Sequence, residues 1–384
     1  MNVEGSIRIR LQPQALGPRR VGIESTRPQI AARLLEGRTV AEALRLLPRV
    51  FSVCGMAQAA AGARACASAL GETPAPEAER NREQAVAVES LREHLWRIVL
   101  DWPIFLDRPV DRRPLSEMLA VQQAWQAATG DDWRHPGRPD AATRSKLQAR
   151  LRCLLTDTVF GMPPERWLAL STPDELAVWL EPEPTLAAAM LAAVIRRGWA
   201  GIGQCEVPSL PADLEPARVQ ARLAAPAFMQ RPEWEGRCRE TSTFTRTRTP
   251  LLAALRAQHG NGLLPRLVAR LSEMAQLCLR LENEADPPLP VPPSGGIGEA
   301  AAARGRLIHA VQVDGDGRVC RYRILAPTDW NFHPHGVVAQ ALAELDGDAD
   351  LIAEQTRQIV QAIDPCVGYE LTLAPAPESR LAHA

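Results

Sequence analysis

The sequence lacks the charge imbalance that marks many binding proteins. Lysine is almost absent, since Lys146 is the only one, and the 44 basic residues are otherwise arginine. They face 45 acidic residues, which leaves a net charge of −1. Balanced charge gives no sign of the basic surface with which proteins bind nucleic acids or anionic membranes. We therefore expect neither nucleic acid nor membrane among the partners.

Three further features are missing. The eight cysteines include no CxxC pair and follow no regular spacing, which argues against a disulfide framework in a chain of 384 residues. Residues 1–13 lack the apolar run of a signal peptide, and no apolar stretch is long enough to cross a bilayer. These absences favour a cytoplasmic protein with reduced thiols.

What is present predicts a mainly α fold with a small β hairpin element (α+β), in a single domain over 1–384. Apolar periodicity and alanine content predict helices, which end near prolines or glycines. The expected helices are 28–47, interrupted at Gly37 and ended by Pro48, then 54–70, 86–100, 141–155, 185–197, 251–281 and 351–363. The segments 307–313 and 318–325 flank the turn residues 314–317 and predict a hairpin. The Pro/Gly-rich run 286–298 is typical of a linker or surface loop.

Five segments, taken in chain order, are similar to segments of the [NiFe]-hydrogenase large subunit. LLEGRTVAEALRLLPRVFSVCG (34–55) resembles the family's first metal-ligand segment, and Asp364-Pro365-Cys366 resembles its last. Between them, PEWEGRCRETSTFTR (232–246), ARGRLIH (303–309) and APTDWNFHP (326–334) resemble three further family blocks. Each block alone is a weak signal, whereas five in order are specific. Residues 110–230 carry little of the resemblance.

The resemblance implies a metal site that has lost half of its ligands. In the family, four cysteine thiolates hold nickel and an Fe(CN)₂CO unit, because soft thiolates suit both metals. Here the first cysteine pair corresponds to Phe51 and Cys54, and the second to Cys366 and Tyr369. Two thiolates can hold an iron that already carries three diatomic ligands, but they cannot build a four-sulfur nickel site. We therefore expect Cys54 and Cys366 to bind Fe(CN)₂CO transiently, without nickel.

Other positions of the family's site also separate into residues that this sequence has lost and residues that it keeps. The family's proton-relay glutamate corresponds to Ala32, and two of its histidines correspond to Gln58 and Thr372. By contrast, the resemblance implies that Arg304 faces the cyanides of the iron unit, where a guanidinium can donate charge-assisted hydrogen bonds. It also implies that Pro327 and Thr328 line the same pocket. The iron half of the site is thus kept, and the nickel and proton half is lost.

Simpler interpretations compete at each position. Cys54 and Cys366 could be structural thiols, as we expect for the other six cysteines, which should be buried. Phe51 and Tyr369 could be ordinary core aromatics. His333 and His335 could bind a metal together, but we expect a loop or surface role for them. Without the resemblance, Arg304 would be interpreted as a surface charge.

The chain is identified as a member of the HupK/HoxV family of hydrogenase maturation scaffolds, a degenerate relative of the large subunit. This implies a non-catalytic protein that receives Fe(CN)₂CO and passes it to the hydrogenase large-subunit precursor. The implied partners are a HypC-like chaperone, a HypC–HypD iron carrier complex and that precursor. The alternative is a metal-free interaction protein with a hydrogenase/complex I-like fold. A hydrogenase with an altered site is disfavoured by the missing thiolates.

Overall fold

A computed structural model describes residues 5–12, 18–27, 30–283 and 295–374. The strands are β1 (Ile7–Gln12), β2 (Arg20–Ser25), β3 (Ile297–Ala302), β4 (Gly305–Val313), β5 (Val319–Leu325) and β6 (Tyr369–Leu373). The helices of the first half are α1 (Ile30–Arg33), α2 (Val40–Val50), α3 (Gly55–Leu70), α4 (Pro76–Trp96), the π-helical turn η1 (Arg97–Asp101), α5 (Trp102–Phe105), α6 (Arg113–Thr129), α7 (Ala141–Leu155), a second π-helical turn η2 (Thr156–Phe160), α8 (Pro164–Ala169), α9 (Pro173–Leu180) and α10 (Leu186–Arg196). Those of the second half are α11 (Pro216–Leu223), α12 (Pro226–Gln230), α13 (Thr243–Arg246), α14 (Pro250–His259), α15 (Leu263–Glu282), α16 (Pro327–Asn331), α17 (Val337–Ala343) and α18 (Ala349–Ile363).

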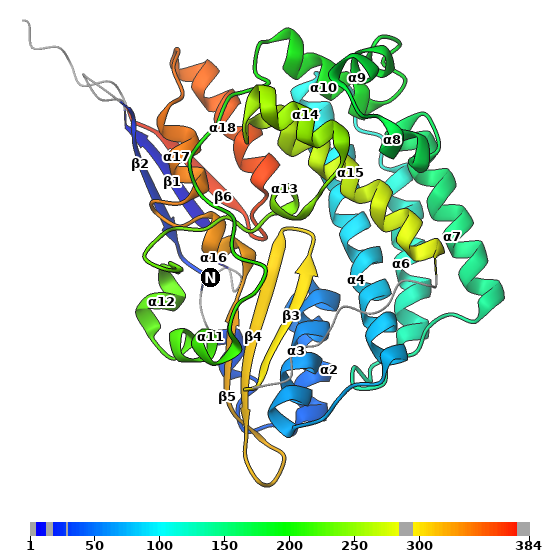
Figure 1. Cartoon of the computed structure of the whole chain (residues 1–384), viewed down its shortest axis with the longest axis vertical. Helices are drawn as coiled ribbons and strands as arrows, with labels where there is room; N and C mark the ends of the chain where they lie inside the picture. The colour runs from blue at the N-terminus through cyan, green and yellow to red at the C-terminus, as the bar shows by residue number, and fades with distance from the viewer. Residues whose placement is uncertain (1–4, 13–17, 28–29, 284–294, 375–384) are drawn as a thin grey trace, which may run out of the picture.

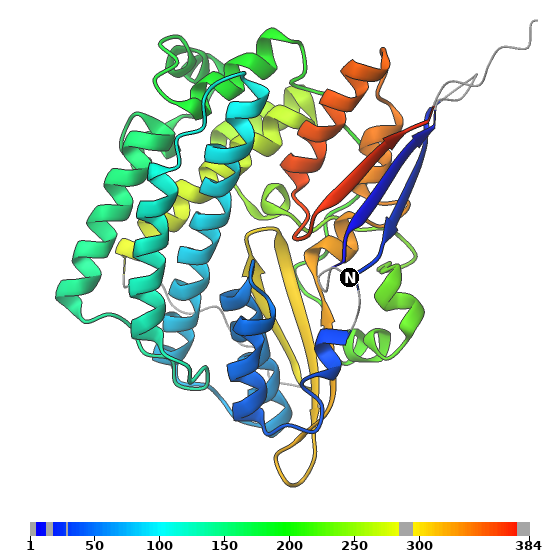
Figure 2. The same ribbon diagram turned by 180° about the vertical axis from the view of Figure 1, so that it is seen from behind.

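Two three-stranded sheets organise the molecule (Figure 1). The central sheet is antiparallel, with the order β3-β4-β5, and α3 lies against it. The second sheet has the order β2-β1-β6 and joins the two ends of the chain, because β1 pairs in parallel with β6. Residues Ile7, Ile9 and Leu11 on β1 point inward and belong to the apolar cluster that includes residues of α17 and α18. Seen from behind, this second sheet lies beside those two helices (Figure 2).

Helix α3 approaches the central sheet unusually closely. Its sequence is mostly alanine and glycine, and it is buried along most of its length. A Cβ atom at Gly298 on β3 would lie 2.2 Å from both the Ala61 carbonyl oxygen and the Ala65 amide nitrogen, so only glycine fits there. Small residues on both elements thus let the middle of α3, at Ala61 and Ala65, lie directly against β3.

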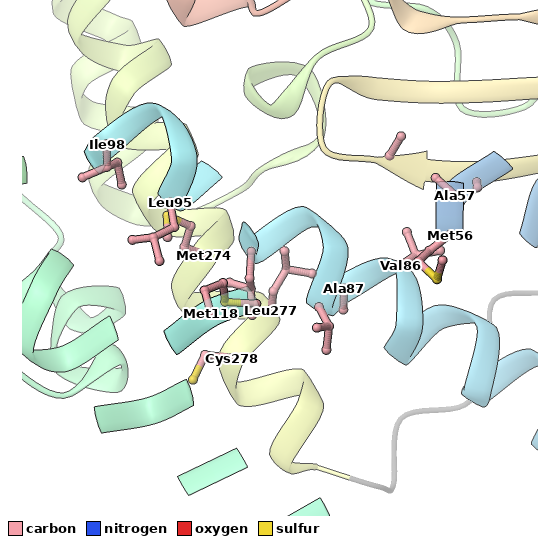
Figure 3. Packing of buried hydrophobic residues seen from close by; sticks show 14 of the residues in the cluster. Met56, Ala57, Val86, Ala87, Leu95, Ile98, Met118, Met274, Leu277 and Cys278 are labelled. Carbon is pink, nitrogen blue, oxygen red and sulfur yellow. The ribbon is translucent and has the colours of Figure 1, made fainter. Parts of the chain in front are cut away.

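Long helices form the other side of the molecule. Helices α4, α6 and α15 pack together in one continuous apolar core (Figure 3), and α7 packs on α6 and α15. Leu95, Ile98, Met118, Met274 and Leu277 all belong to this core. No described helix has both the length and the apolar character needed to span a membrane.

The expected mainly α fold with some β structure is confirmed, and so is the hairpin, as β4 and β5. Three predicted boundaries were wrong. Pro48 lies inside α2 rather than ending it, and the expected helix 251–281 is broken at Gly260 into α14 and α15. Helix α4 also begins ten residues before the expected start at residue 86. The sheet β2-β1-β6 was not predicted, because its strands come from opposite ends of the chain.

The expected linker, 286–298, falls mainly outside the described residues. Of its described part, Gly295 and Gly296 form a turn, while Ile297 and Gly298 already belong to β3.

Candidate functional site

Two chain segments from opposite ends of the sequence bring Cys54 and Cys366 together. Cys54 is the residue that precedes the first turn of α3, and Cys366 follows the end of α18. Burial is the main cause that raises the pKa of Cys54 to about 12, and the Cys366 sulfur raises it further. Cys366 therefore lies within electrostatic reach of Cys54, and a shared metal site at the two thiols stays a prediction.

Glu89 occupies two of the helix amides beside Cys54. A cysteine at a helix N-terminus normally has a lowered pKa, because the free amides favour the thiolate. Here the Glu89 carboxylate accepts hydrogen bonds from the amides of Met56 and Ala57, at 2.7 and 3.0 Å. Burial nevertheless raises the pKa of Glu89 to about 7, and its charge also raises that of Cys54.

A chain of buried hydrogen-bonded side chains, formed by Gln58, His309 and Tyr322, ends at the Cys54 sulfur. The Gln58 amide donates to the Cys54 sulfur at 3.4 Å, and its carbonyl oxygen lies 2.8 Å from Nε2 of His309. Nδ1 of His309 is 2.8 Å from the Tyr322 hydroxyl. Burial lowers the pKa of His309 to about 3, so the ring is neutral. It donates through Nε2 to Gln58 and accepts through Nδ1 from Tyr322, which fixes the orientation of the Gln58 amide.

Thr328 holds Cys366 through a reciprocal pair of hydrogen bonds. The Thr328 hydroxyl donates to the Cys366 sulfur at 3.1 Å, and the Cys366 amide donates to the same hydroxyl at 3.2 Å. Pro327 is buried as the first residue of α16 and packs close to Gly305. Of the two residues expected to line the pocket, Thr328 thus touches a predicted ligand, and Pro327 positions the helix that carries it.

Arg304 lies beside the same loop. Its Nε donates to the Pro365 carbonyl oxygen at 3.2 Å, and Nη1 pairs with Glu93 at 2.7 Å. Nε is also 3.3 Å from the Asp364 carboxylate. The side chain is buried, so the interpretation of Arg304 as a surface charge is excluded. Its second terminal nitrogen, Nη2, takes part in none of these bonds.

Three arginines converge on Asp364, the residue that begins the Asp-Pro-Cys segment. Arg97 contacts the carboxylate at 2.7 Å, Arg304 at 3.3 Å and Arg270 at 3.7 Å. Arg97 comes from η1, a π-helical turn, and such turns frequently occur at functional sites. Asp364 itself has a φ of +68°, which is a strained conformation for a non-glycine residue. The cluster therefore fixes the backbone that presents Cys366.

Arg27 belongs to the site, although nothing in the sequence indicated it. It pairs with Asp329 on α16 at 2.8 Å. Burial disfavours its charge, but Cys366, Asp329 and Cys54 together raise the pKa of Arg27 above its ordinary value. The guanidinium therefore lies within electrostatic reach of both thiols. Its segment precedes α1 and is far from either cysteine in sequence, so only tertiary structure could identify it.

The departures from the large-subunit pattern have structural roles. Phe51 is half-buried against the main core, and Tyr369 is half-buried on β6, beside β1. Ala32 is buried, whereas Thr372 is exposed on β6. Among the remaining cysteines, the expectation of burial was wrong at Cys153 and Cys320, which are exposed, and correct at Cys66 and Cys278. His333 and His335 lie in a loop, as one part of the expectation had it, but the His333 side chain is buried whereas His335 is exposed.

Alkylation rates provide a direct check on the Cys54 environment. A thiol with a pKa of about 12 forms little thiolate at pH 8, so Cys54 should react at least about 100-fold more slowly than an ordinary exposed thiol. Mass spectrometry of peptides after timed iodoacetamide treatment measures this, with exposed Cys153 and Cys320 as internal references. Equal rates at Cys54 and Cys153 would contradict this environment.

The same raised pKa has a consequence for stability. The free energy of unfolding should fall above about pH 9, because there the Cys54 thiol ionises in the unfolded chain but not in the folded protein.

Solved structures similar to this chain are hydrogenases. The [NiFeSe] hydrogenase of Desulfovibrio vulgaris Hildenborough in its oxidised state matches with a TM-score of 0.65 at 15% identity, over 92% of this chain and 94% of that chain. An NAD⁺-reducing [NiFe]-hydrogenase matches with a TM-score of 0.59 at 17% identity, over 91% and 93%. At these identities the likeness shows the fold alone, which is the large-subunit fold expected from the sequence.

Curated relatives cover nearly the whole chain. Hydrogenase expression/formation protein HoxV of Cupriavidus necator is 35% identical over 92% of this chain and 93% of its own length. HupV of Azotobacter chroococcum is 30% identical over 90% and 91%, and HupK of Azotobacter vinelandii is 28% identical over 96% and 98%. No protein-family model matches the chain. On the identity and coverage of these relatives, the chain belongs to the HoxV/HupK/HupV family of hydrogenase expression/formation proteins.

Proposed function

We propose that this protein is a non-catalytic scaffold of [NiFe]-hydrogenase maturation. It holds an Fe(CN)₂CO unit on Cys54 and Cys366 and passes that unit to the hydrogenase large subunit. The observation that carries the proposal is the proximity of two thiols, from opposite ends of the chain, to the half-buried guanidinium of Arg27 and the buried guanidinium of Arg304. The names of the relatives and the large-subunit fold support a role in hydrogenase assembly.

The charges around the thiols suit an anionic cargo. Cyanides and thiolates together outweigh the charge of a ferrous ion, so the bound unit carries net negative charge. Each thiol loses its proton on binding, and Arg27 and Arg304 would offset the resulting charge in this half-buried site. Nη2 of Arg304 is the nitrogen that would donate to a cyanide, because Nε and Nη1 are held by Pro365, Asp364 and Glu93.

The retained residues favour this proposal over both alternatives. A working nickel site needs four thiolates, and Phe51 and Tyr369 occupy two of those positions. In a metal-free interaction protein, in contrast, no function would require a threonine and a glutamine that each donate a hydrogen bond to a thiol sulfur. The proposed partners are a HypC-like chaperone, the HypC–HypD iron carrier complex and the large-subunit precursor. The proposed compartment is the cytoplasm, because both ligands must stay reduced and all eight cysteines are free thiols.

Infrared spectroscopy of the intact protein tests this function. Protein purified without oxygen from a host with the full maturation machinery should show cyanide and CO stretching bands and stoichiometric iron. The same protein from a host that lacks the iron carrier complex should show neither. We expect no stoichiometric nickel and no hydrogen uptake. An absence of bands in both preparations would favour the metal-free alternative, and stoichiometric nickel would refute the loss of the nickel site.

A further inference from the structure

A tight turn places Glu233 and Cys238 side by side, outside the site described above. Trp234 and Arg237 exchange both backbone hydrogen bonds, at 3.0 and 3.2 Å, as a closed antiparallel pair. The two residues between them, Glu235 and Gly236, have φ values of +57° and +68°, the conformation of a two-residue hairpin turn. Glu233 and Cys238 are the next residues outward from that pair, so this backbone fixes their separation.

His333 completes the cluster from a different element. It follows α16, and its side chain is only 1% exposed. Nδ1 lies 3.1 Å from the Cys238 sulfur, and Nε2 lies 3.9 Å from a Glu233 carboxylate oxygen. Trp234, from the turn, and Trp330, from α16, are buried in the same apolar cluster. The turn and the helix therefore hold the three side chains in a fixed relation.

The hydrogen bonding of His333 is incomplete. Its Nδ1 faces two donors at once, because the His335 amide donates to it at 3.1 Å and the Cys238 sulfur is equally close. One lone pair cannot satisfy both fully. Nε2 is buried and has no hydrogen-bond partner among the described residues, since the Glu233 carboxylate at 3.9 Å is beyond hydrogen-bond range. Buried polar atoms without partners are uncommon, and a role in binding an ion is one recognised reason for them.

We propose that Glu233, Cys238 and His333 bind a divalent transition-metal ion of the zinc class. One ligand atom from each residue lies within 4.8 Å of the other two. Bonds of about 2.0–2.3 Å to one ion would require these atoms to move closer together by side-chain rotation. Imidazole, thiolate and carboxylate are together the donor set that Zn²⁺ accepts, and three protein ligands leave the fourth position open. Metal binding also resolves the competition at Nδ1, because Cys238 then loses its proton.

Solvent can reach this site, whereas its imidazole is buried. The Glu233 side chain is 47% exposed and provides a path for entry, while the buried His333 holds the ion against the core. Helix α16 links the site to the thiol pair, since Thr328 contacts Cys366 and His333 follows the end of the same helix. The two sites share no ligand, so this proposal does not rest on the proposed function.

Cobalt binding to the full-length protein tests the site. A Cys54→Ser/Cys366→Ser variant removes the other thiol pair, and metal is stripped with a chelator before Co²⁺ is added. We expect this variant to develop sulfur-to-cobalt charge-transfer absorption, which Zn²⁺ then displaces. Adding Cys238→Ser should abolish that absorption and weaken Zn²⁺ binding at least about tenfold, because removing a ligand costs no less than removing its supporting contacts. Cys205→Ser is the matched control, since Cys205 and Cys238 are both half-buried and both pack against the apolar cluster that includes residues of β1, α17 and α18.

Two further variants separate a metal site from a structural contact. Glu233→Gln alters a partly exposed side chain, so it should fold normally yet weaken Zn²⁺ binding at least about tenfold. His333→Gln should do the same, with circular dichroism to confirm folding. The proposal is overturned if the parent variant shows no charge-transfer absorption, or if Cys238→Ser leaves it unchanged. Full Zn²⁺ affinity in Glu233→Gln would equally overturn the three-ligand site.

Discussion

Replacing Asp364 by asparagine is expected to lower the free energy of unfolding by about 3–5 kcal/mol, since it leaves buried charges without their partner. Arg97, Arg270 and Arg304 all contact this carboxylate. Burial raises the pKa of Asp364, but the three guanidinium groups outweigh it and bring the pKa down to about 2. Asparagine tolerates a positive φ, so the change removes the charge without altering the backbone preference.

Urea unfolding followed by circular dichroism measures this loss. Asp346→Asn is the matched control, because Asp346 is fully exposed and lies 4.0 Å from Arg19, so we expect no measurable change in stability. The sign of the pH dependence follows from the lowered pKa. The contribution of Asp364 is complete well above its ordinary value of 3.8 and is lost as the pH falls toward 2. A loss below about 1 kcal/mol in Asp364→Asn would show that the arginines find other partners.

The same substitution should also disturb the thiol site. Asp364 directly precedes Pro365 and Cys366, and Arg304 contacts both the carboxylate and the Pro365 carbonyl oxygen. An uncharged residue at this position frees the guanidinium to move, and the loop that presents Cys366 moves with it. The Asp-Pro-Cys segment thus joins a structural charge and a proposed ligand in three consecutive residues.

The sequence predicts those residues of the site that lie in segments resembling the hydrogenase large subunit. Cys54, Cys366 and Arg304 lie in segments that resemble family blocks, so the resemblance alone is enough to name them. Thr328 is named in the same way, and its two hydrogen bonds to Cys366 are visible only in the folded chain. The metal-binding role of the cysteines stays a prediction.

The rest of the site could not be predicted from the sequence. Arg27, Glu89 and Arg97 lie outside the resembling segments, and their roles arise only where elements distant in sequence pack together. The fold shows the same limit. Local signals predicted α3, α7 and the hairpin, because alanine content, helical periodicity and turn residues act over a few positions. Pairing between the two ends of the chain, in β1 and β6, has no local signal.

Iron retention should fall furthest when either proposed ligand is removed. Cys54→Ala and Cys366→Ala each leave a single thiolate, and we expect both to lose essentially all iron and all cyanide bands during purification. Arg304→Leu removes a charge-assisted hydrogen bond worth about 1.5–3 kcal/mol, which corresponds to a loss of affinity of about 10- to 150-fold. Arg304→Lys keeps the charge but not the planar fork, so its retention should lie between those of the wild type and Arg304→Leu.

Arg27→Leu extends this series to the arginine that only the structure identified. It should weaken retention in the same direction as Arg304→Leu, because the Arg27 charge acts on both thiols. Arg306→Leu is the matched control, since Arg306 lies two residues from Arg304 but pairs with Glu299 instead. Iron is measured per folded monomer after gel filtration, so a variant that merely unfolds is not counted as one that releases iron. A shift of the cyanide stretching frequency in Arg304→Lys would indicate direct contact, because a purely structural arginine would leave the frequency unchanged. Should Arg304→Leu and Arg27→Leu both keep wild-type iron and cyanide bands, the cargo does not sit between these two arginines.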